Sequence, residues 1–218
     1  MRLIDLCEGR LDELKPSHAK NLRDMETNNP YAPNMEKYLK QNGFKLLGSG
    51  VYSQVWSQPK SNAVVKLTKV NGDKCWMSFA EYTLGHPNKH FPKISNLRVY
   101  KQSDVGKNPV FYCFVERLIH LDKIPKTKET FPLLAFLFTQ MNIRLLEQED
   151  IIKFMDEPNY SKIELEGSRY KDAQSFKAAL KDLENNCPAT CGMDLGKRNI
   201  MYRPSTGTLV ISDPYADE

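Results

Sequence analysis

Three short runs rich in β-branched and aromatic residues follow one another between residues 44 and 70, and they constrain the fold more than any other feature. The runs 44–47, 51–58 and 63–70 are joined by Gly-Ser-Gly and by a Pro-Lys-Ser-Asn turn, which are typical hairpin connections. A helix is predicted next, at about 74–84, followed by strands at about 97–101 and 109–116. The sequence therefore predicts a five-stranded antiparallel sheet that carries one helix.

The segments on either side of this sheet have a helical pattern. Two helices are expected before it, at about 2–14 and 35–41, and Gly43 is placed to end the second in a left-handed cap. After Leu118, apolar residues recur at three- and four-residue spacing over 131–155 and 170–185, which predicts helices. Two short strands, 200–202 and 208–211, follow. We expect an α+β fold with a helical extension (1–42), a β-rich lobe (43–118) and a reduced, mostly helical lobe (119–218).

Composition excludes several classes of protein. The 218 residues carry a net charge of +4 that is spread along the chain, which does not favour a nucleic-acid partner. No apolar run is long enough to span a membrane, and the charged start does not resemble a signal peptide. The five cysteines are an odd, scattered set, as expected of reduced thiols in a cytoplasm. Cys187 and Cys191 have no second pair of ligands, so structural zinc is not favoured.

The loop between the first two predicted strands contains Gly48 and Gly50. Glycine lets a backbone turn tightly and approach a phosphate group closely. Val55, on the second strand, could cover the face of a purine. A simple hairpin turn is the alternative interpretation of the two glycines.

Lys66 lies inside the apolar run 63–67. A lysine in such a strand is either on the solvent side of the pleat or directed inward at a buried anion. Its spacing from Gly50 suits a lysine that holds the α- and β-phosphates of a nucleotide. Glu81 in the next helix could pair with Lys66, or it could be an ordinary exposed carboxylate.

Asp194 and Asn199 are five residues apart in a loop that we expect to be entered from a helix and left through a strand. An aspartate base and a metal ligand with this spacing can face one γ-phosphate, and Lys197 between them could neutralise the transferred group. Asp213 ends an apolar strand, where it could bind Mg²⁺ or simply begin a turn before Pro214. Four elements thus follow one another in the sequence: the glycine loop, Lys66, the pair Asp194 and Asn199, and Asp213. Their order indicates phosphoryl transfer.

These motifs together resemble those of a known family. It is similar to protein kinase-like enzymes, and more narrowly to the early serine/threonine kinase of lytic bacteriophages of the autographivirus type. The resemblance spans about residues 43–215 and is carried by 43–50, 64–66, 193–194 with 199–201, and 211–214. Ser53 stands where the protein-kinase loop carries a third glycine.

The resemblance implies a two-lobed protein kinase-like fold and an ATP- and Mg²⁺-dependent enzyme that phosphorylates Ser/Thr of host proteins in the cytoplasm of the host bacterium. Asp194, Lys66 and Lys197 would be catalytic, and Asn199 and Asp213 would hold the metal. Backbone groups near Glu116 and Leu118 would meet the adenine. The residues expected to cover the nucleotide are Gly48, Ser49, Gly50, Val51, Tyr52, Ser53 and Val55.

The chain departs from protein kinases in general at several points. Gly192-Met193 replaces the His-Arg that precedes the catalytic aspartate, and Asp213-Pro214-Tyr215 replaces Asp-Phe-Gly. Activation-loop phosphorylation and an inactive flip of this segment are therefore not expected. We expect either a minimal kinase or a piece of a longer protein.

Two alternatives remain open. A small-molecule kinase of the aminoglycoside or choline type shares the four elements, although such enzymes usually carry His-Gly before the aspartate. A non-catalytic, kinase-shaped inhibitor of a host enzyme is the other, although a pure binder has no need of Lys66, Asp194, Asn199 and Asp213 together.

Overall fold

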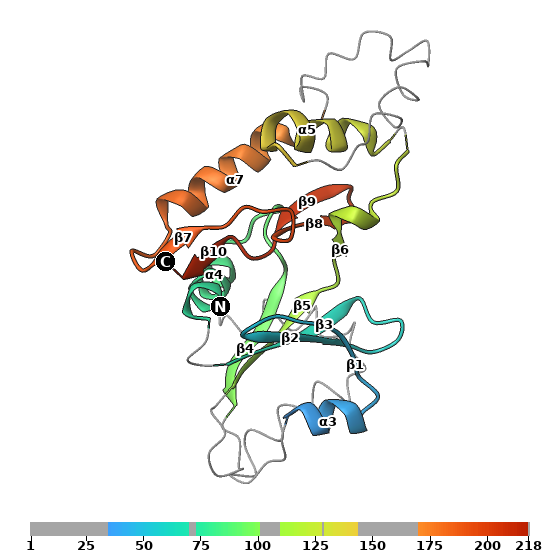
Figure 1. Cartoon of the computed structure of the whole chain (residues 1–218), viewed down its shortest axis with the longest axis vertical. Helices are drawn as coiled ribbons and strands as arrows, with labels where there is room; N and C mark the ends of the chain where they lie inside the picture. Colours follow the sequence, from blue (N-terminus) through green and yellow to red (C-terminus); the bar gives the residue numbers. More distant parts are fainter. Residues whose placement is uncertain (1–34, 70–72, 101–109, 128, 144–169, 218) are drawn as a thin grey trace, which may run out of the picture. The chain divides into compact units, whose positions relative to one another are not determined.

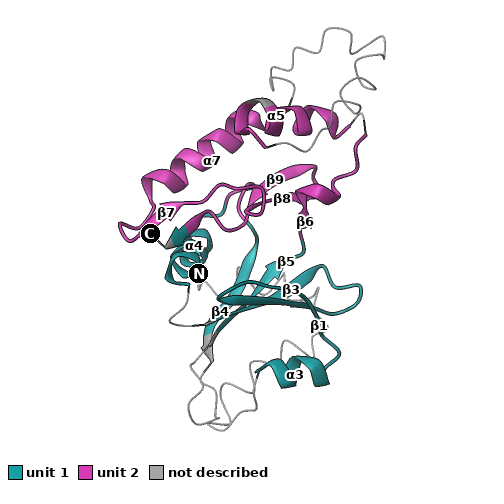
Figure 2. Cartoon of the chain, in the orientation of Figure 1, with its two compact units in different colours: residues 1–87, 92–117, 216–218 teal, residues 88–91, 118–215 magenta. Residues whose placement is uncertain are grey.

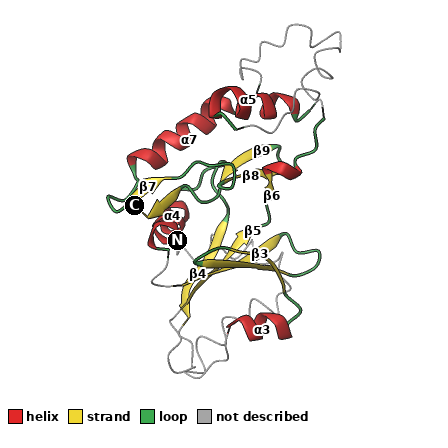
Figure 3. Ribbon diagram, in the orientation of Figure 1, coloured by secondary structure: helices red, strands yellow, loops and turns green. Residues whose placement is uncertain are grey.

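The computed structural model describes residues 35–69, 73–100, 110–127, 129–143 and 170–217. They belong to two compact units (Figure 2), one of residues 1–87, 92–117 and 216–218 and one of residues 88–91 and 118–215. Both units combine helices with strands (Figure 3), so the predicted α+β class is confirmed. The helix predicted at about 2–14 lies outside the described residues.

The first unit is built on a five-stranded antiparallel sheet (Figure 1), as predicted. Its strand order is β1-β2-β3-β5-β4, so β1 and β4 are the edge strands. Register shifts interrupt the β1–β2 pair near Gly48 and the β4–β5 pair after Ser95. The strands are β1 (Lys45–Ser49), β2 (Ser53–Ser57), β3 (Ala63–Lys69), β4 (Ile94–Tyr100) and β5 (Val110–Glu116).

Helix α3 (Met35–Gln41) ends where the sequence predicts. Gly43 has a φ of +78°, and its N–H donates to the carbonyl oxygen of Lys40 at 3.1 Å. The N–H of Phe44 donates to the carbonyl oxygen of Leu39 at 2.9 Å. The left-handed glycine thus ends the helix and turns the chain toward β1.

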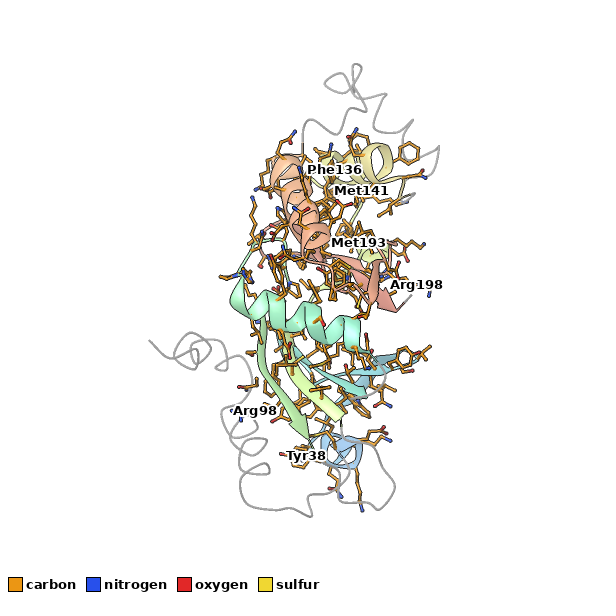
Figure 4. All side chains as sticks on the ribbon, turned by 90° about the vertical axis from the view of Figure 1, so that its left-hand side faces the viewer. Tyr38, Arg98, Phe136, Met141, Met193 and Arg198 are labelled. Carbon is orange, nitrogen blue, oxygen red and sulfur yellow. The ribbon has the colours of Figure 1, made fainter. Side chains whose placement is uncertain are left out.

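One face of the sheet packs against α3 in a hydrophobic cluster. Alternate residues of a strand point to opposite faces, so Val65 and Leu67 of β3 lie on the face that meets α3, while Lys66 lies on the other. Tyr38, labelled in Figure 4, packs against the same cluster. Its buried members are Met35, Leu39, Phe44, Trp56, Ala63, Val65, Leu67, Tyr112 and Phe114.

Helix α4 (Lys74–Gly85) meets the opposite face of the sheet. Its N-cap is Asp73, whose carboxylate accepts a hydrogen bond from the N–H of Trp76 at 3.0 Å. The ring of Trp76 is buried, and the Nζ of Lys66 lies 3.8 Å from the ring centroid. The two helices therefore cover the two faces of one sheet.

The second unit contains a three-stranded antiparallel sheet of order β6-β8-β9, together with strand β7 and the first residue of β10, Tyr215. Strands β8 and β9 match the two predicted near the end of the chain, whereas β6, β7 and β10 were not predicted because each has only two or three residues. The elements are β6 (Ile119–His120), η2 (Leu121–Lys123), α5 (Phe131–Met141), α7 (Ala173–Asn185), β7 (Cys191–Met193), β8 (Ile200–Arg203), β9 (Thr208–Ile211) and β10 (Tyr215–Asp217).

Helix α5 is shorter than predicted. It begins with a proline in its first turn and ends at Asn142, which adopts a left-handed conformation with φ 53°. Asparagine tolerates this conformation better than most residues, so the prediction of one unbroken helix is wrong at Asn142, and its part from 144 to 155 lies outside the described residues. Phe136, labelled in Figure 4, packs with its ring 5.9 Å from that of Phe176 on α7.

Residues 88–91 are anchored in the second unit. The buried Arg203 donates to the carbonyl oxygens of Lys89 and of Phe91, the latter at 2.9 Å. His90 has no exposed surface, and its Nδ1 lies 2.8 Å from the carbonyl oxygen of Leu209. Its Nε2 lies 2.9 Å from the hydroxyl of Ser175. Both ring nitrogens are thus satisfied inside the protein.

The cysteines differ from the prediction. Cys75 takes part in a disulfide, and so does Cys191, so the expectation of reduced thiols is wrong for each of them. Cys113 and Cys187 are not part of a disulfide. In the described part of the chain no cluster of His, Cys, Asp and Glu could hold a metal by itself. None of the described helices combines the length and hydropathy needed to cross a membrane.

Leu39→Ala should lower the free energy of unfolding by about 2–5 kcal/mol, because it leaves a cavity in the cluster between α3 and the sheet. Urea unfolding measures the change. Lys37→Ala, at an exposed position of the same helix, is the control and should change it by less than about 0.5 kcal/mol. Equal effects of the two variants would show that α3 is not packed on the sheet.

Burial lowers the pKa of His90 below its usual value. The unfolded chain therefore takes up a proton near pH 6.5, the ordinary value, whereas the folded chain does so only at lower pH. The neutral, buried His90 therefore contributes to stability above about pH 6.5. As the pH falls below this value, the free energy of unfolding decreases by at most about 1.4 kcal/mol per pH unit.

In His90→Gln the free energy of unfolding should decrease less steeply as the pH falls. Unfolding measured between about pH 5 and pH 8 gives this slope. The exposed His86 offers a matched control, because His86→Gln should leave the fall in place. An unchanged slope in His90→Gln would show that another group causes the acid sensitivity.

Candidate functional site

The predicted nucleotide loop connects β1 and β2 in the first unit. Gly48 is paired with Val55 and Ser49 with Gln54, and the N–H of Gly50 donates to the carbonyl oxygen of Ser53 at 2.7 Å. Val51 and Tyr52 lie at the tip with 77% and 43% of their surface exposed. The loop thus presents its backbone and its tip to solvent.

The two loop glycines are not required by the hairpin itself. Only Gly43 and Gly207 among the described glycines have a positive φ. A Cβ on Gly48 would meet no described atom within 4 Å, and one on Gly50 would come no closer than 3.8 Å to Ser53. A tight turn alone therefore does not explain these glycines, whereas the close approach of a ligand would.

Lys66 lies in a row of residues that crosses three strands. It is paired with Val55 on β2 and with Cys113 on β5, so these side chains share one face of the sheet. Burial raises the pKa of the Cys113 thiol to about 12, so both strand neighbours of Lys66 are uncharged. The half-buried Lys66 thus lies between two uncharged strand neighbours on the face opposite α3.

Glu81 does not take the place predicted for it. It lies at an exposed position of α4, and no ion pair joins it to Lys66 within the described unit. The contact seen for Lys66 on α4 is the ring of Trp76. Sequence analysis missed Trp76 because a tryptophan in the first turn of an amphipathic helix reads as an ordinary core residue.

The segment predicted to meet adenine already uses part of its backbone. The N–H of Glu116 donates to the carbonyl oxygen of Lys93 at 3.0 Å, and that of Arg117 donates to Asn62 at 2.6 Å. These two N–H groups are engaged within the protein. The backbone groups predicted to meet the adenine would therefore be others near Glu116 and Leu118. Leu118 is half-buried and begins the longer segment of the second unit.

In the second unit, the β8–β9 hairpin brings Asn199 next to Ser212. Ile200 is paired with Ile211, so the residues just outside this pair meet. The carbonyl oxygen of Asn199 accepts hydrogen bonds from the N–H of Ser212 at 2.8 Å and from its hydroxyl at 3.1 Å. The half-buried Asp213 follows directly, so the hairpin register places it beside Asn199.

A second set of bonds fixes the start of the Asp194 loop. The N–H of Asp194 donates to the carbonyl oxygen of Pro214 at 2.6 Å. The loop is entered from strand β7 rather than from a helix, which corrects the prediction. Tyr215 is buried and donates its hydroxyl proton to the carbonyl oxygen of Leu183 on α7 at 2.7 Å. Asp213 is thus flanked by anchored residues on both sides.

Asn199 is oriented as a metal ligand would be. Its Nδ2 donates to the carbonyl oxygen of Asp194 at 2.9 Å, so its Oδ1 is directed away from that bond. An amide oxygen and a carboxylate are hard donors that suit Mg²⁺, which usually completes its shell with water and phosphate oxygens. Asn199 and Asp213 fit such a site.

Lys197 has an ion-pair partner that the sequence did not indicate. Its Nζ lies 3.4 Å from an oxygen of Asp122 in η2, and the other oxygen of Asp122 lies 3.2 Å from Nδ1 of His120. About half of each side chain of the Lys197–Asp122 pair is exposed, and such pairs contribute little to stability. The ion pair orients Lys197 within the Asp194 loop, but it is weak enough to be broken at little cost in free energy.

The structure places the predicted residues in two groups, which belong to different units. The loop 48–55, Lys66, Glu81 and Glu116 are in the first unit, and Leu118, Asp194, Lys197, Asn199 and Asp213 are in the second. Hydrogen bonds connect the segments that carry Asp194, Asn199 and Asp213. In this second group two carboxylate residues and one amide residue come from two hydrogen-bonded segments of the chain.

Neither a model of a known protein family nor a curated protein sequence matches this chain. Among solved structures, aminoglycoside phosphotransferase APH(4)-Ia aligns with a TM-score of 0.39 and 14% identity over 84% of this chain and 72% of that one. The apo form of a thermostable mutant of that enzyme aligns with a TM-score of 0.40 and 14% identity over 84% and 73%.

Gly48→Ala should leave the free energy of unfolding unchanged within about 0.5 kcal/mol, because the new methyl group meets no described neighbour and the backbone is not strained. Gly43→Ala is the matched contrast and should destabilise the protein by about 1 kcal/mol, because its backbone is left-handed. Chemical unfolding of both variants provides the measurement. A loss at Gly48 as large as that at Gly43 would mean that the fold itself requires this glycine.

Proposed function

We propose that this protein is an ATP- and Mg²⁺-dependent kinase that phosphorylates serine and threonine hydroxyls of host proteins. The observation that carries the proposal is the hydrogen-bonded arrangement in which Asp194, Asn199 and Asp213 are held together by the β8–β9 hairpin and by the Asp194–Pro214 bond. Phosphoryl transfer needs little beyond positioned charges of this kind.

Asp194 would orient the substrate hydroxyl and accept its proton as the oxygen attacks the γ-phosphorus. Its side chain is at an exposed position. Its backbone is fixed, because its N–H donates to Pro214 and its carbonyl oxygen accepts from Asn199. Lys197 would leave the exposed Asp122 and neutralise charge on the transferred group. This exchange costs little, because an exposed ion pair is weak in water.

Magnesium would supply charge neutralisation at the phosphates. Asn199 through Oδ1 and Asp213 through its carboxylate would hold it. Lys66 would hold the α- and β-phosphates, and the glycine loop would cover the nucleotide with its backbone. The freedom of Gly48 from packing supports this role, so Gly48→Ala should weaken ATP binding although it leaves the fold intact.

A protein substrate is favoured by the resemblance to the phage kinases and is compatible with the exposure of Asp194, which leaves room for a hydroxyl carried on a large partner. The same resemblance leads us to propose the host cytoplasm as the place of action. A small-molecule kinase and a non-catalytic inhibitor remain outcomes of the test.

The decisive experiment incubates the protein with γ-labelled ATP, Mg²⁺ and a bacterial lysate. We expect labelled protein bands, with the label on serine and threonine. Label confined to small molecules would show a small-molecule kinase, and a complete absence of transfer would favour the non-catalytic binder.

Asp194→Asn should keep the fold and ATP binding and should lower turnover by about 10²- to 10⁴-fold, the usual contribution of a positioned base. Initial rates with one labelled protein substrate provide the measurement. Asp182→Asn on α7, an aspartate outside the candidate site, is the control and should keep full activity. Retention of more than about a tenth of the activity in Asp194→Asn would remove the base from the mechanism.

A further inference from the structure

A contact between Lys66 and Trp76 joins α4 to the lysine face of the sheet. The Nζ of Lys66 lies 3.8 Å from the centroid of the indole ring. A cation within about 6 Å of an aromatic centroid and over its face is attracted by the negative charge on that face, and tryptophan is the strongest such partner. The distance places this contact well inside that range.

Capping fixes the backbone of the first turn of α4, and burial confines the indole ring of Trp76. The Asp73 carboxylate caps the first turn of α4 through the N–H of Trp76, and the N–H of Met77 donates to the carbonyl oxygen of Asp73 at 3.2 Å. Only 2% of the surface of Trp76 is exposed. The ring is therefore a fixed platform, whereas lysine has a flexible four-carbon stem.

An indole differs from a carboxylate as a partner for a lysine that must bind phosphate. A carboxylate offsets the positive charge and occupies N–H donors of the ammonium. A ring face attracts an ammonium group without carrying a net charge, so such a contact neither offsets the positive charge nor occupies the N–H groups directed away from the ring. Glu81, a carboxylate on the same helix, is at an exposed position, whereas the buried Trp76 makes the contact with Lys66.

We propose that Trp76 is the positioning residue for Lys66, holding its ammonium by a cation–π contact in the place where the nucleotide phosphates bind. This inference rests on the proposed ATP-dependent function and adds to it the residue that orients the phosphate-binding lysine. Trp76 acts through Lys66 and does not itself touch the nucleotide.

The test replaces tryptophan by its mono-, di- and trifluorinated analogues during expression. These analogues are nearly the same size as tryptophan, while each fluorine weakens the negative ring face, so packing is kept and the contact with the cation is reduced. The chain has only two tryptophans, and Trp56 belongs to the cluster on the α3 face. Trp76→Phe carrying the same analogues at Trp56 is therefore the matched control.

We expect the dissociation constant of ATP to rise stepwise with the number of fluorines, by roughly threefold to thirtyfold over the series. The affinity for adenosine, which has no phosphates, should stay constant. In the Trp76→Phe control, fluorination should not change ATP binding. The ε-methylene protons of Lys66 should show an upfield ring-current shift that disappears in Trp76→Leu.

The outcomes separate this inference from the proposed function. If the unmodified protein binds no ATP, both are overturned. If it binds ATP and Lys66→Met weakens that binding, but fluorination has no effect, only the role of Trp76 is overturned. Tighter ATP binding on fluorination would also overturn it, because Trp76 would then withdraw Lys66 from the phosphates.

Discussion

The alternation of side chains along β3 is the constraint on which the first unit depends. Val65 and Leu67 point into the cluster with α3, and Lys66 between them points to α4. A slip of one residue in the pairing with β2 or β5 would exchange the two faces, placing the lysine in the α3 cluster and apolar side chains against Trp76. The register that builds the core is thus the same one that presents the cation.

The hairpin formed by β8 and β9 has the corresponding role in the second unit. Its register determines that Asn199 meets Ser212, and the position of Asp213 follows from that meeting. The proposed metal ligands therefore need no dedicated scaffold, since the backbone pairing of two four-residue strands brings them together. Such an arrangement suits a small unit, in which few residues can be spared for support alone.

Much of this fold could be predicted because its signals are local. The strands of the large sheet follow from short apolar runs between turn residues, and Gly43 follows from the need for a left-handed residue after a helix. The end of α5 at Asn142 was missed, because apolar spacing continued past it and outweighed the asparagine. The loop with Asp194 was found from its residue types, but β7 before it was too short to show a period.

The contacts of the candidate site were harder to predict than its residues. Glu81 was predicted as a partner of Lys66 because it is a carboxylate in the helix that follows, yet the sequence of a helix does not reveal which of its turns meets a given strand. The first turn of α4, with its Asp73 cap, provides Trp76 instead. Contacts of this kind depend on how a helix lies on a sheet, which is determined by packing over the whole unit.

The anchoring of the Asp213 segment has a consequence for the speed of any motion there. Ser212 is bonded to Asn199, Pro214 to Asp194 and Tyr215 to α7, so Asp213 can swing away only if several of these bonds break together. Such openings are cooperative local unfolding events rather than rotations of a single peptide. Any motion of Asp213 away from Asn199 should therefore be slower than the rotation of a single peptide group.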